Sequence, residues 1–410
     1  MTAMVRYEFQ KMFGGIGGKI ALLLYVLVAI FSCCLSATGT MNTGTGWVNS
    51  QGITEFGPAA IRNMQKAQSE WTGFLDQELL TRVVQENARI NATPEAHSKS
   101  IPELDTAFGW KQGFAPIRDL ISEAYAPSFR AYDYYKADAI TSIRVETFYR
   151  NRVEQVKEWL QDNGQFSENE KAFILRQYES LQTPFYFAYH NGWYQLLENV
   201  YLIPTLGILI LGFVLSGIFA NESKWNTEAI CFSACYGRTK AVSAKIRAGL
   251  LLITAAYWGA ALVYTLFTLG YLGSGGGQCV VQLRVWRSLY NVTLRKAFAL
   301  TLFSGYIGNL FLGALTMYIS ARTKSSVIAV TVPFVLIFFP TFLQDKAVWL
   351  DTLIGLLPAS LLQFYQRLSS FQFLTLFGSV FREMDVCIPL YALLTLLLIP
   401  LMYREYSRMR

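Results

Sequence analysis

Apolar residues along this chain gather into six blocks, each about as long as the roughly 20-residue helix that crosses a lipid bilayer. The cores of these blocks contain no Asp, Glu, Lys, Arg or His, the residues that are most costly in the hydrocarbon layer. The pattern predicts six transmembrane helices, at residues 20–38, 200–220, 248–272, 297–321, 325–344 and 385–403. Pro333 and Pro340 should kink the fifth helix, because proline lacks a backbone N–H.

The first residues of the chain have the pattern of an amphipathic helix. Val5, Phe9 and Met12 fall on one face of a helix, while Arg6 and Gln10 fall on another. A helix of this kind lies in the membrane interface rather than across the membrane. We therefore expect residues 1–19 to form an interfacial helix before the first span.

Residues 39–199 are long enough to form a domain of their own between the first two spans. Few stretches in this segment alternate as strands do, and apolar positions from Ile61 to Ile90 predict one long helix. Ser167 followed by Glu170 matches the capping box that begins a helix. The segment should be a mostly helical domain.

Residues 345–383 contain two further apolar patches, TLIGLLPASLLQF and LSSFQFLTLFGSVF. Each patch is too short to cross a bilayer. We expect a re-entrant or interfacial helical hairpin before the last span, although a single distorted crossing is an alternative. The predicted fold is thus an all-α integral membrane protein with six spans, an interfacial helix, a helical domain and this hairpin.

Composition supports a membrane protein and gives its orientation. The 410 residues are 53% hydrophobic and 15% charged, whereas soluble proteins carry about 25% charged residues. Lys and Arg are more frequent in the segments that lie inside if the N-terminus is cytoplasmic. This places residues 221–247 and the tail 404–410 in the cytoplasm, and residues 39–199 and the loop 273–296 outside. The net charge of +7 then belongs to loops facing the membrane, not to a surface for nucleic acid.

Residues that could carry chemistry are scarce. The two histidines, His97 and His190, are far apart, and we expect neither to be catalytic. None of the six cysteines lies in residues 39–199, and Cys231 and Cys235 have no nearby His, so a structural role is expected and no metal site. The GGIGGKI stretch lacks the first glycine and the hydroxyl residue of a phosphate loop. We expect no catalytic residues and no cofactor in this chain.

One polar residue lies in the middle of the fourth span. Asn309 is surrounded by Ser304, Gly308 and Gly313, small residues that allow helices to approach closely. These four residues indicate either helix packing or a polar point on a translocation path or dimer seam.

The loop at residues 221–247 is a charged cassette between the second and third spans. Apolar Trp225, Ala229, Ile230 and Phe232 alternate with charged residues, which predicts a short amphipathic helix parallel to the membrane. Such a helix can dock in a groove of a partner and transmit its motion. An ordinary positively charged loop is the alternative.

At these residues the chain resembles the permease subunits of ABC exporters with the type V fold. The matching positions are Glu222, Asn226-Thr227, Ser233, Gly237-Arg238 and Lys245. Asn226 stands where that family usually has Gly, and Ala234-Cys235 departs from its usual Thr-Pro. The position of the large domain is similar to that in the sodium-exporter-like and lipid-exporter-like branches.

The resemblance implies a permease subunit in the bacterial plasma membrane, with both termini cytoplasmic and no enzymatic activity of its own. A separate cytoplasmic ABC ATPase would bind ATP and Mg²⁺, and a second permease chain, identical or different, would complete a dimer. The implied cargo is an exported amphiphile such as an antimicrobial peptide, a lipid-like compound or a drug. The implied coupling residues are Asn221, Glu222, Lys224, Thr227, Glu228, Gly237, Arg238 and Lys245.

Two other functions fit the same sequence. One is an ATPase-driven mechanotransmitter that moves its outer domain to act on an envelope protein and carries no cargo. The other is a membrane sensor or immunity protein whose outer domain binds a ligand.

Overall fold

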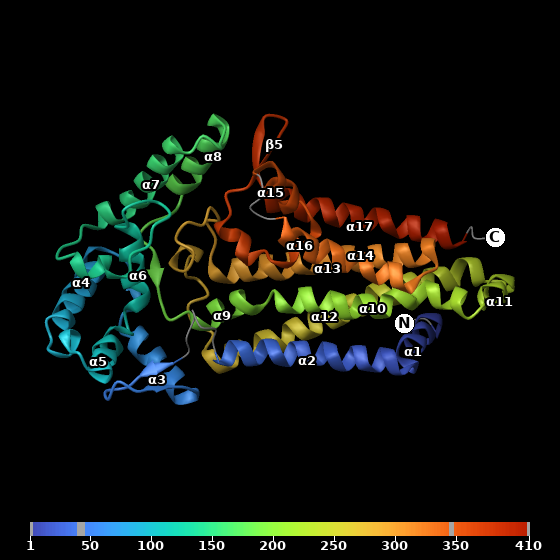
Figure 1. Cartoon of the computed structure of the whole chain (residues 1–410), viewed down its shortest axis with the longest axis horizontal. Coiled ribbons are helices and arrows are strands. Elements are labelled where there is room, and N and C mark those ends of the chain that lie inside the picture. Colours follow the sequence, from blue (N-terminus) through green and yellow to red (C-terminus); the bar gives the residue numbers. More distant parts are fainter. Residues whose placement is uncertain (1–2, 39–45, 344–347, 408–410) are drawn as a thin grey trace.

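The computed structural model of the chain describes residues 3–38, 46–343 and 348–407. It is mostly helical, at 73% of residues. A long helical bundle forms one part of the elongated molecule, and residues 46–190, here called the large domain, form the other (Figure 1). Both termini and the short helix α11 lie at the end of the bundle farthest from the large domain (Figure 1), which we call the terminal end.

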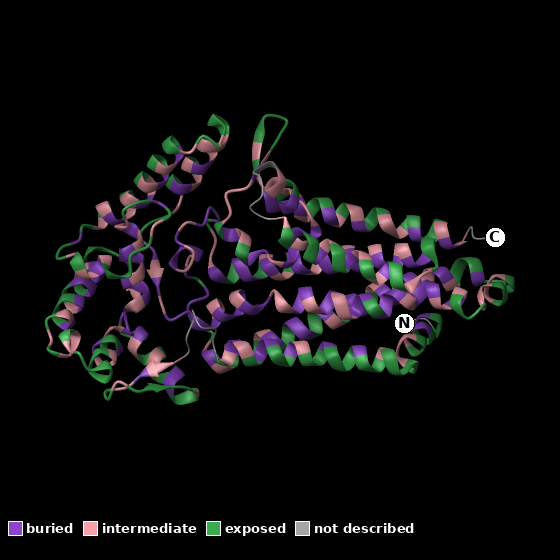
Figure 2. Ribbon diagram, viewed as in Figure 1, coloured by how far each residue is buried: buried purple, intermediate pink, exposed green. Residues whose placement is uncertain are grey.

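Five helical segments among the described residues are long and apolar enough to cross a membrane, which is compatible with a multi-pass membrane protein. They contain α2 (Ile16–Thr38), α9 and α10 (Asn191–Asn199 and Leu202–Lys224), α12 (Val242–Leu272), α13 (Leu294–Thr323) and α17 (Glu383–Ser407). The segments with α10 and α13 are the most buried, whereas α2, α12 and α17 have broad exposed apolar faces (Figure 2). The centre of the bundle is therefore the contact between α10 and α13.

The expected fifth span at residues 325–344 is shorter than the others. Helix α14 (Ser326–Phe338) passes into a 3₁₀ turn, η5 (Phe339–Phe342), and the apolar stretch Ser326–Phe342 is too short to count with the five. Proline explains the change, since Pro340 cannot donate the backbone hydrogen bond that would continue the α-helix. The prediction of six full-length spans is thus not confirmed.

The segment before α17 differs from the helical hairpin that the sequence predicts. Its first patch forms α15 (Val348–Gly355) and α16 (Pro358–Leu362), but the second patch forms a β-hairpin of β5 (Phe373–Leu376) and β6 (Ser379–Arg382) after the 3₁₀ helix η6 (Tyr365–Ser369). The prediction of helix was wrong here because Phe377 and Gly378, with φ of 52° and 79°, form a two-residue turn that reverses the chain. Residues 344–347 of the expected hairpin lie outside the described part.

The large domain is a set of short helices with two small strand pairs. Its helices are α3 (Pro58–Ser69), α4 (Gln77–Asn91), η1 (Glu95–His97), α5 (Ile101–Lys111), α6 (Ala115–Ala124), η2 (Tyr134–Ala139), α7 (Val145–Asp162) and α8 (Glu168–Glu179). Its strand pairs are β1 (Trp47–Val48) with β2 (Thr54–Glu55), and β3 (Gly73–Phe74) with β4 (Tyr186–Phe187). The mostly helical expectation is confirmed, as is the capping box of Ser167 and Glu170 at the start of α8.

The single long helix expected from Ile61 to Ile90 is wrong. The chain breaks between α3 and α4, because β3 pairs with the distant β4. Asp76 then starts α4 afresh by accepting a hydrogen bond from the Leu79 backbone N–H at 3.0 Å. Periodicity alone did not reveal this break, since the pairing partner lies more than a hundred residues further on.

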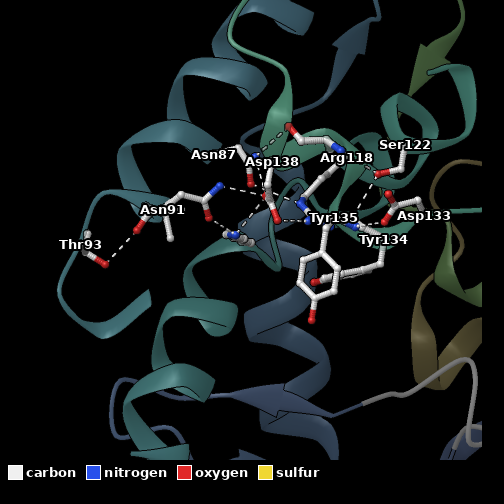
Figure 3. A network of polar contacts seen from close by, with 12 residues as sticks. Asn87, Asn91, Thr93, Arg118, Ser122, Asp133, Tyr134, Tyr135 and Asp138 are labelled. Atoms are coloured by element: carbon white, nitrogen blue, oxygen red, sulfur yellow. Dashed lines mark hydrogen bonds and ion pairs between the residues drawn. The ribbon is translucent and has the colours of Figure 1, made fainter. Parts of the chain in front are cut away.

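A partly buried polar network joins three helices of the large domain (Figure 3). Asp138 accepts hydrogen bonds from the side-chain amides of Asn87 and Asn91, each at 2.9 Å, and from Arg118 at 2.8 Å. Burial raises the pKa of Asp138, but these donors outweigh burial and the pKa is lowered. The network therefore ties η2 to α4 and α6.

The large domain is also fixed to the bundle through the loop between α12 and α13, which contains the 3₁₀ helix η4 (Val281–Leu283). Buried Arg152 of α7 donates hydrogen bonds to the carbonyls of Trp286 and Ser288 in this loop, each at 3.2 Å. Arg287 of the loop pairs with Glu123 of α6 at 2.8 Å. The loop between α12 and α13 is thus bonded to both α6 and α7 of the large domain.

Candidate functional site

The predicted cassette forms a helical connection at the terminal end of the bundle. After α10 ends at Lys224, α11 (Glu228–Ser233) and a π-helical turn (Gly237–Ala241) lead directly into α12. Asn226 has a φ of 55°, in the left-handed region that Asn and Gly tolerate best. Gly237 is required where the turn passes α11, because a Cβ there would lie 1.7 Å from the carbonyl oxygen of Cys231.

Large apolar side chains of the cassette point away from the protein. Trp225 is 62% exposed, Ile230 72% and Tyr236 48%. Lys224 and Arg238 beside them are exposed as well. A surface with apolar anchors and a charged rim at one end of the bundle has the composition of a protein-docking site.

Directly beneath this surface lies a buried cluster of charges. Glu222, at the end of α10, pairs with Lys245, near the start of α12, at 2.6 Å between Oε1 and Nζ. The two side chains are only 10% and 2% exposed. Buried ion pairs hold their geometry tightly because separation would leave a charge without solvent. The pair therefore locks together the two long helices that flank α11.

Helix α1 (Ala3–Gly14) contributes two further charges to the cluster. Glu8 lies 3.1 Å from Lys245 and 3.3 Å from Lys11, and Lys11 lies 3.1 Å from Glu222. Burial lowers the pKa of Lys11, but the two carboxylates outweigh burial and the pKa is raised. The predicted apolar face of α1 is confirmed, and it packs against Ala244 and Ala248 of α12.

The last helix completes the cluster. Tyr406 of α17 donates a hydrogen bond to the second carboxylate oxygen of Glu222 at 2.5 Å. Its ring packs against Phe219 of α10 and Phe232 of α11, with centroid distances of 4.6 and 5.3 Å. One carboxylate thus joins α1, α10, α12 and α17, with α11 resting on the tyrosine ring.

The structure brings together only part of the predicted coupling set. Glu222 and Lys245 form the buried pair, while Glu228 pairs with Lys324 at 2.9 Å at the surface. Arg238 reaches the Ser407 carbonyl at 3.4 Å and lies over the Phe232 ring. Thr227 contacts the Glu222 carbonyl at 3.3 Å, and Asn221 is half-buried.

The four residues predicted in the fourth span lie in α13, away from the cassette, where α13 packs against neighbouring helices. Ser304 donates to the Leu361 carbonyl of α16 at 2.9 Å, and Asn309 donates to the Pro204 carbonyl of α10 at 3.1 Å. Added Cβ atoms on Gly308 and Gly313 would meet Leu362 at 2.8 Å and Ile253 at 2.3 Å. All four are buried, at places where helices pack closely.

Sequence reasoning missed Glu8, Lys11 and Tyr406. A signal for Glu8 was present, because it lies three residues after Val5 and four before Met12, on the apolar face of the first helix. A carboxylate on such a face needs a buried partner. Nothing in the sequence pointed to Tyr406, whose role depends on α17 ending beside α10.

Comparisons with known proteins give no match: no protein-family model, no curated protein and no solved structure is similar to this chain. In the described part of the chain, no group of three or more His, Cys, Asp or Glu side chains could hold a metal ion.

Proposed function

We propose that this chain is the membrane subunit of an ABC transporter of the exporter type, driven by a separate ATPase. The observation that carries the proposal is that the exposed side chains of Trp225, Ile230 and Tyr236 lie directly above the buried charge cluster around Glu222 and Lys245. A docking helix must present side chains to a partner and be rigidly linked to the helices that it moves. The cassette meets both requirements.

The backbone at Asn226 also supports the resemblance to type V permeases. The family usually has glycine there, and Asn226 occupies the left-handed region that glycine adopts without strain. The sequence difference at this position is therefore compatible with the same turn. In the proposed complex, the ATPase binds ATP and Mg²⁺, a second permease chain faces this one, and the cargo is an amphiphile.

The test separates docking from coupling. The tagged chain is purified in mild detergent, and co-purifying proteins are identified by mass spectrometry. We expect a stoichiometric nucleotide-binding partner with the wild type, which Ile230→Asp loses and Glu222→Gln retains without stimulated ATPase activity. Tyr135→Asp, at a 72% exposed position on the large domain, is the matched control and should retain both.

Failure of the wild-type chain to bring down any nucleotide-binding protein in several detergents would overturn the proposal. It would favour the sensor or immunity protein, which needs no ATPase.

A second candidate, the ATPase-driven mechanotransmitter, is favoured by the clamp that Arg152 forms on the loop between α12 and α13. In that function, helix motion is transmitted to the large domain and no cargo moves. ATPase activity that no amphiphile stimulates, together with activation of an envelope protein bound to the large domain, would support it over export.

A further inference from the structure

The β5–β6 hairpin is a surface feature that the proposed docking site does not use. It stands out sideways from the bundle beside α15, close to the start of α17 and on the side of the large domain (Figure 1). Its strands pair from Phe373 with Arg382 to Leu376 with Ser379, and Phe377 and Gly378 form the tip.

The two faces of this hairpin have different neighbours, because side chains alternate along a strand. Phe373 and Val380 belong to an aromatic cluster with Phe166 and Phe173 of the large domain, and the ring of Phe373 lies 5.7 Å from that of Phe173. The other face is turned toward α17. There, Leu376 and Phe381 line a shallow hollow of about 340 Å³ together with Asp385, Val386, Pro389, Leu390 and Leu393 of α17.

Phe377 at the tip is fully exposed, at 106% of its reference area, and has a φ of 52°. The first position of a turn of this type strongly favours Asn, Asp or Gly, because other side chains are strained in the left-handed region. An aromatic residue is therefore neither the favoured choice for the turn nor needed for packing within the chain. Strain at an exposed tip indicates that the side chain serves an external contact.

The apolar surface of the hairpin continues onto α17. Leu393 is 55% exposed and Leu396 64%, on a helix long and apolar enough to span a membrane. On such a helix, exposed leucines face lipid, and Leu and Phe side chains are buried favourably at the boundary between headgroups and acyl chains. Phe377, Leu376 and Phe381 extend this surface at the end of α17 nearest to the large domain.

We propose that the β5–β6 hairpin is a bilayer anchor, with Phe377 inserted at the membrane interface on the side of the large domain. The hollow between the hairpin and α17 holds the acyl chain of a membrane lipid. Arg382 and Asp385, paired at 2.8 Å, lie at the level of the headgroups. Because the opposite face of the hairpin packs on the large domain, the anchor also sets the distance of that domain from the membrane. This inference does not depend on an ATPase partner.

The anchor can be tested by photo-crosslinking in the full chain. The photoreactive amino acid p-benzoyl-phenylalanine replaces Phe377, and the protein is reconstituted into vesicles of phosphatidylethanolamine and phosphatidylglycerol. We expect lipid adducts at position 377 by mass spectrometry after illumination. The same amino acid at Leu396 is the positive control for lipid, and at Tyr135, 72% exposed on the large domain, the negative control.

Each other outcome counts against the anchor. Crosslinks from position 377 to a second copy of the chain would show a protein interface instead. Absence of lipid adducts at 377 while Leu396 forms them would place the tip in water. Absence at both positions would remove the lipid-facing surface on which the anchor depends.

A second variant separates anchoring from folding. Phe377→Asn suits the left-handed turn, so the hairpin should form at least as well. Lipid adducts from the photoreactive residue at Leu376 should nevertheless fall on the order of tenfold in this background, because one inserted aromatic side chain is lost. Unchanged adduct formation would contradict a role for the Phe377 side chain in insertion.

Discussion

Lys245 and Glu222 show how much depends on single side chains at the terminal end. Lys245 contacts Glu8, Glu222 and the Ile218 carbonyl, and it is almost wholly buried. By contrast, Lys324 pairs with Glu228 near the surface, where the two side chains are 39% and 19% exposed. Both pairs have similar distances, but the cost of losing one partner depends on whether water can reach the other.

We therefore expect Lys245→Met to lower the free energy of unfolding by about 3–5 kcal/mol, because buried carboxylates are left underpaired. Lys324→Met should cost about 0–1 kcal/mol. Thermal unfolding in detergent measures both. Adding Glu222→Gln to Lys245→Met should recover part of the loss; a double variant less stable than the single one would contradict the explanation.

We expect His190 to make the stability of the large domain sensitive to acid. Its ring is buried, accepts a hydrogen bond from Arg284 at 2.8 Å, and lies 2.7 Å from the Ala188 carbonyl through Nδ1. Burial and the charge of Arg284 lower the pKa of His190 from 6.5 to about 3. Between these values the unfolded chain binds a proton that the folded chain does not, so the free energy of unfolding falls as pH falls.

The expected slope is up to ~1.4 kcal/mol per pH unit below pH 6.5. His190→Gln, whose amide can both accept and donate, should flatten this part of the stability profile. Melting temperatures at several pH values between 7 and 4 measure the effect. The matched control His97→Gln changes an exposed side chain and should leave the slope as in the wild type. Equal slopes in all three proteins would show that His190 is not responsible.

Among the helices, close packing depends on glycine residues, because they have no side chain. A Cβ added to Gly313 of α13 would lie 2.3 Å from Ile253 of α12 and 3.2 Å from Leu215 of α10. A Cβ added to Gly249 of α12 would lie 2.3 Å from Met317 of α13. These contacts let three long helices pack with little space between them. In contrast, Gly259 of α12 has nothing within 4 Å of its would-be Cβ.

Gly313→Leu should therefore destabilise the bundle by about 1–3 kcal/mol, because the side chain has no room between the helices. Gly259→Leu, on the exposed face of α12, should be tolerated. The melting temperature in detergent and the yield of monodisperse protein measure the difference. Equal behaviour of the two variants would mean that the helices separate easily at Gly313.

In the molecule as a whole, the large domain and the bundle share one hydrophobic core, and Arg152 adds polar contacts between them. Burial lowers the pKa of Arg152 to about 10, and its guanidinium satisfies carbonyls of the loop between α12 and α13. In the proposed mechanotransmitter, motion that starts at α11 would pass along α12 to this loop and then to α7. The clamp is therefore the place to interrupt communication between the two ends.

Arg152→Gln should loosen the loop without unfolding the bundle. We expect faster hydrogen exchange of the backbone amides at residues 281–290, by about tenfold or more, since their local structure loses the hydrogen bonds that anchor it. Arg150→Gln is the matched control, because Arg150 is 61% exposed and pairs with Glu154 at the surface. Unchanged exchange in Arg152→Gln would show that other contacts suffice to hold the loop.

Features that depend on local periodicity and composition could be predicted from the amino-acid sequence. The apolar blocks gave the five long helices, the Val5–Phe9–Met12 face gave α1, and Ser167 with Glu170 gave the start of α8. Each of these follows from neighbours a few residues apart, because helix formation and burial of one face are set within a few turns.

Features that depend on partners distant in sequence became visible only in the folded chain. The break between α3 and α4 required β4, and the β5–β6 hairpin required a turn with two left-handed residues. The charge cluster required α1, α10, α12 and α17 to meet at the terminal end of the bundle. Glu8 and Tyr406 lie 398 residues apart in sequence yet meet around Glu222 and Lys245. Periodicity identifies which face of a helix is buried, but the identity of the neighbour on that face is fixed only when the helices pack.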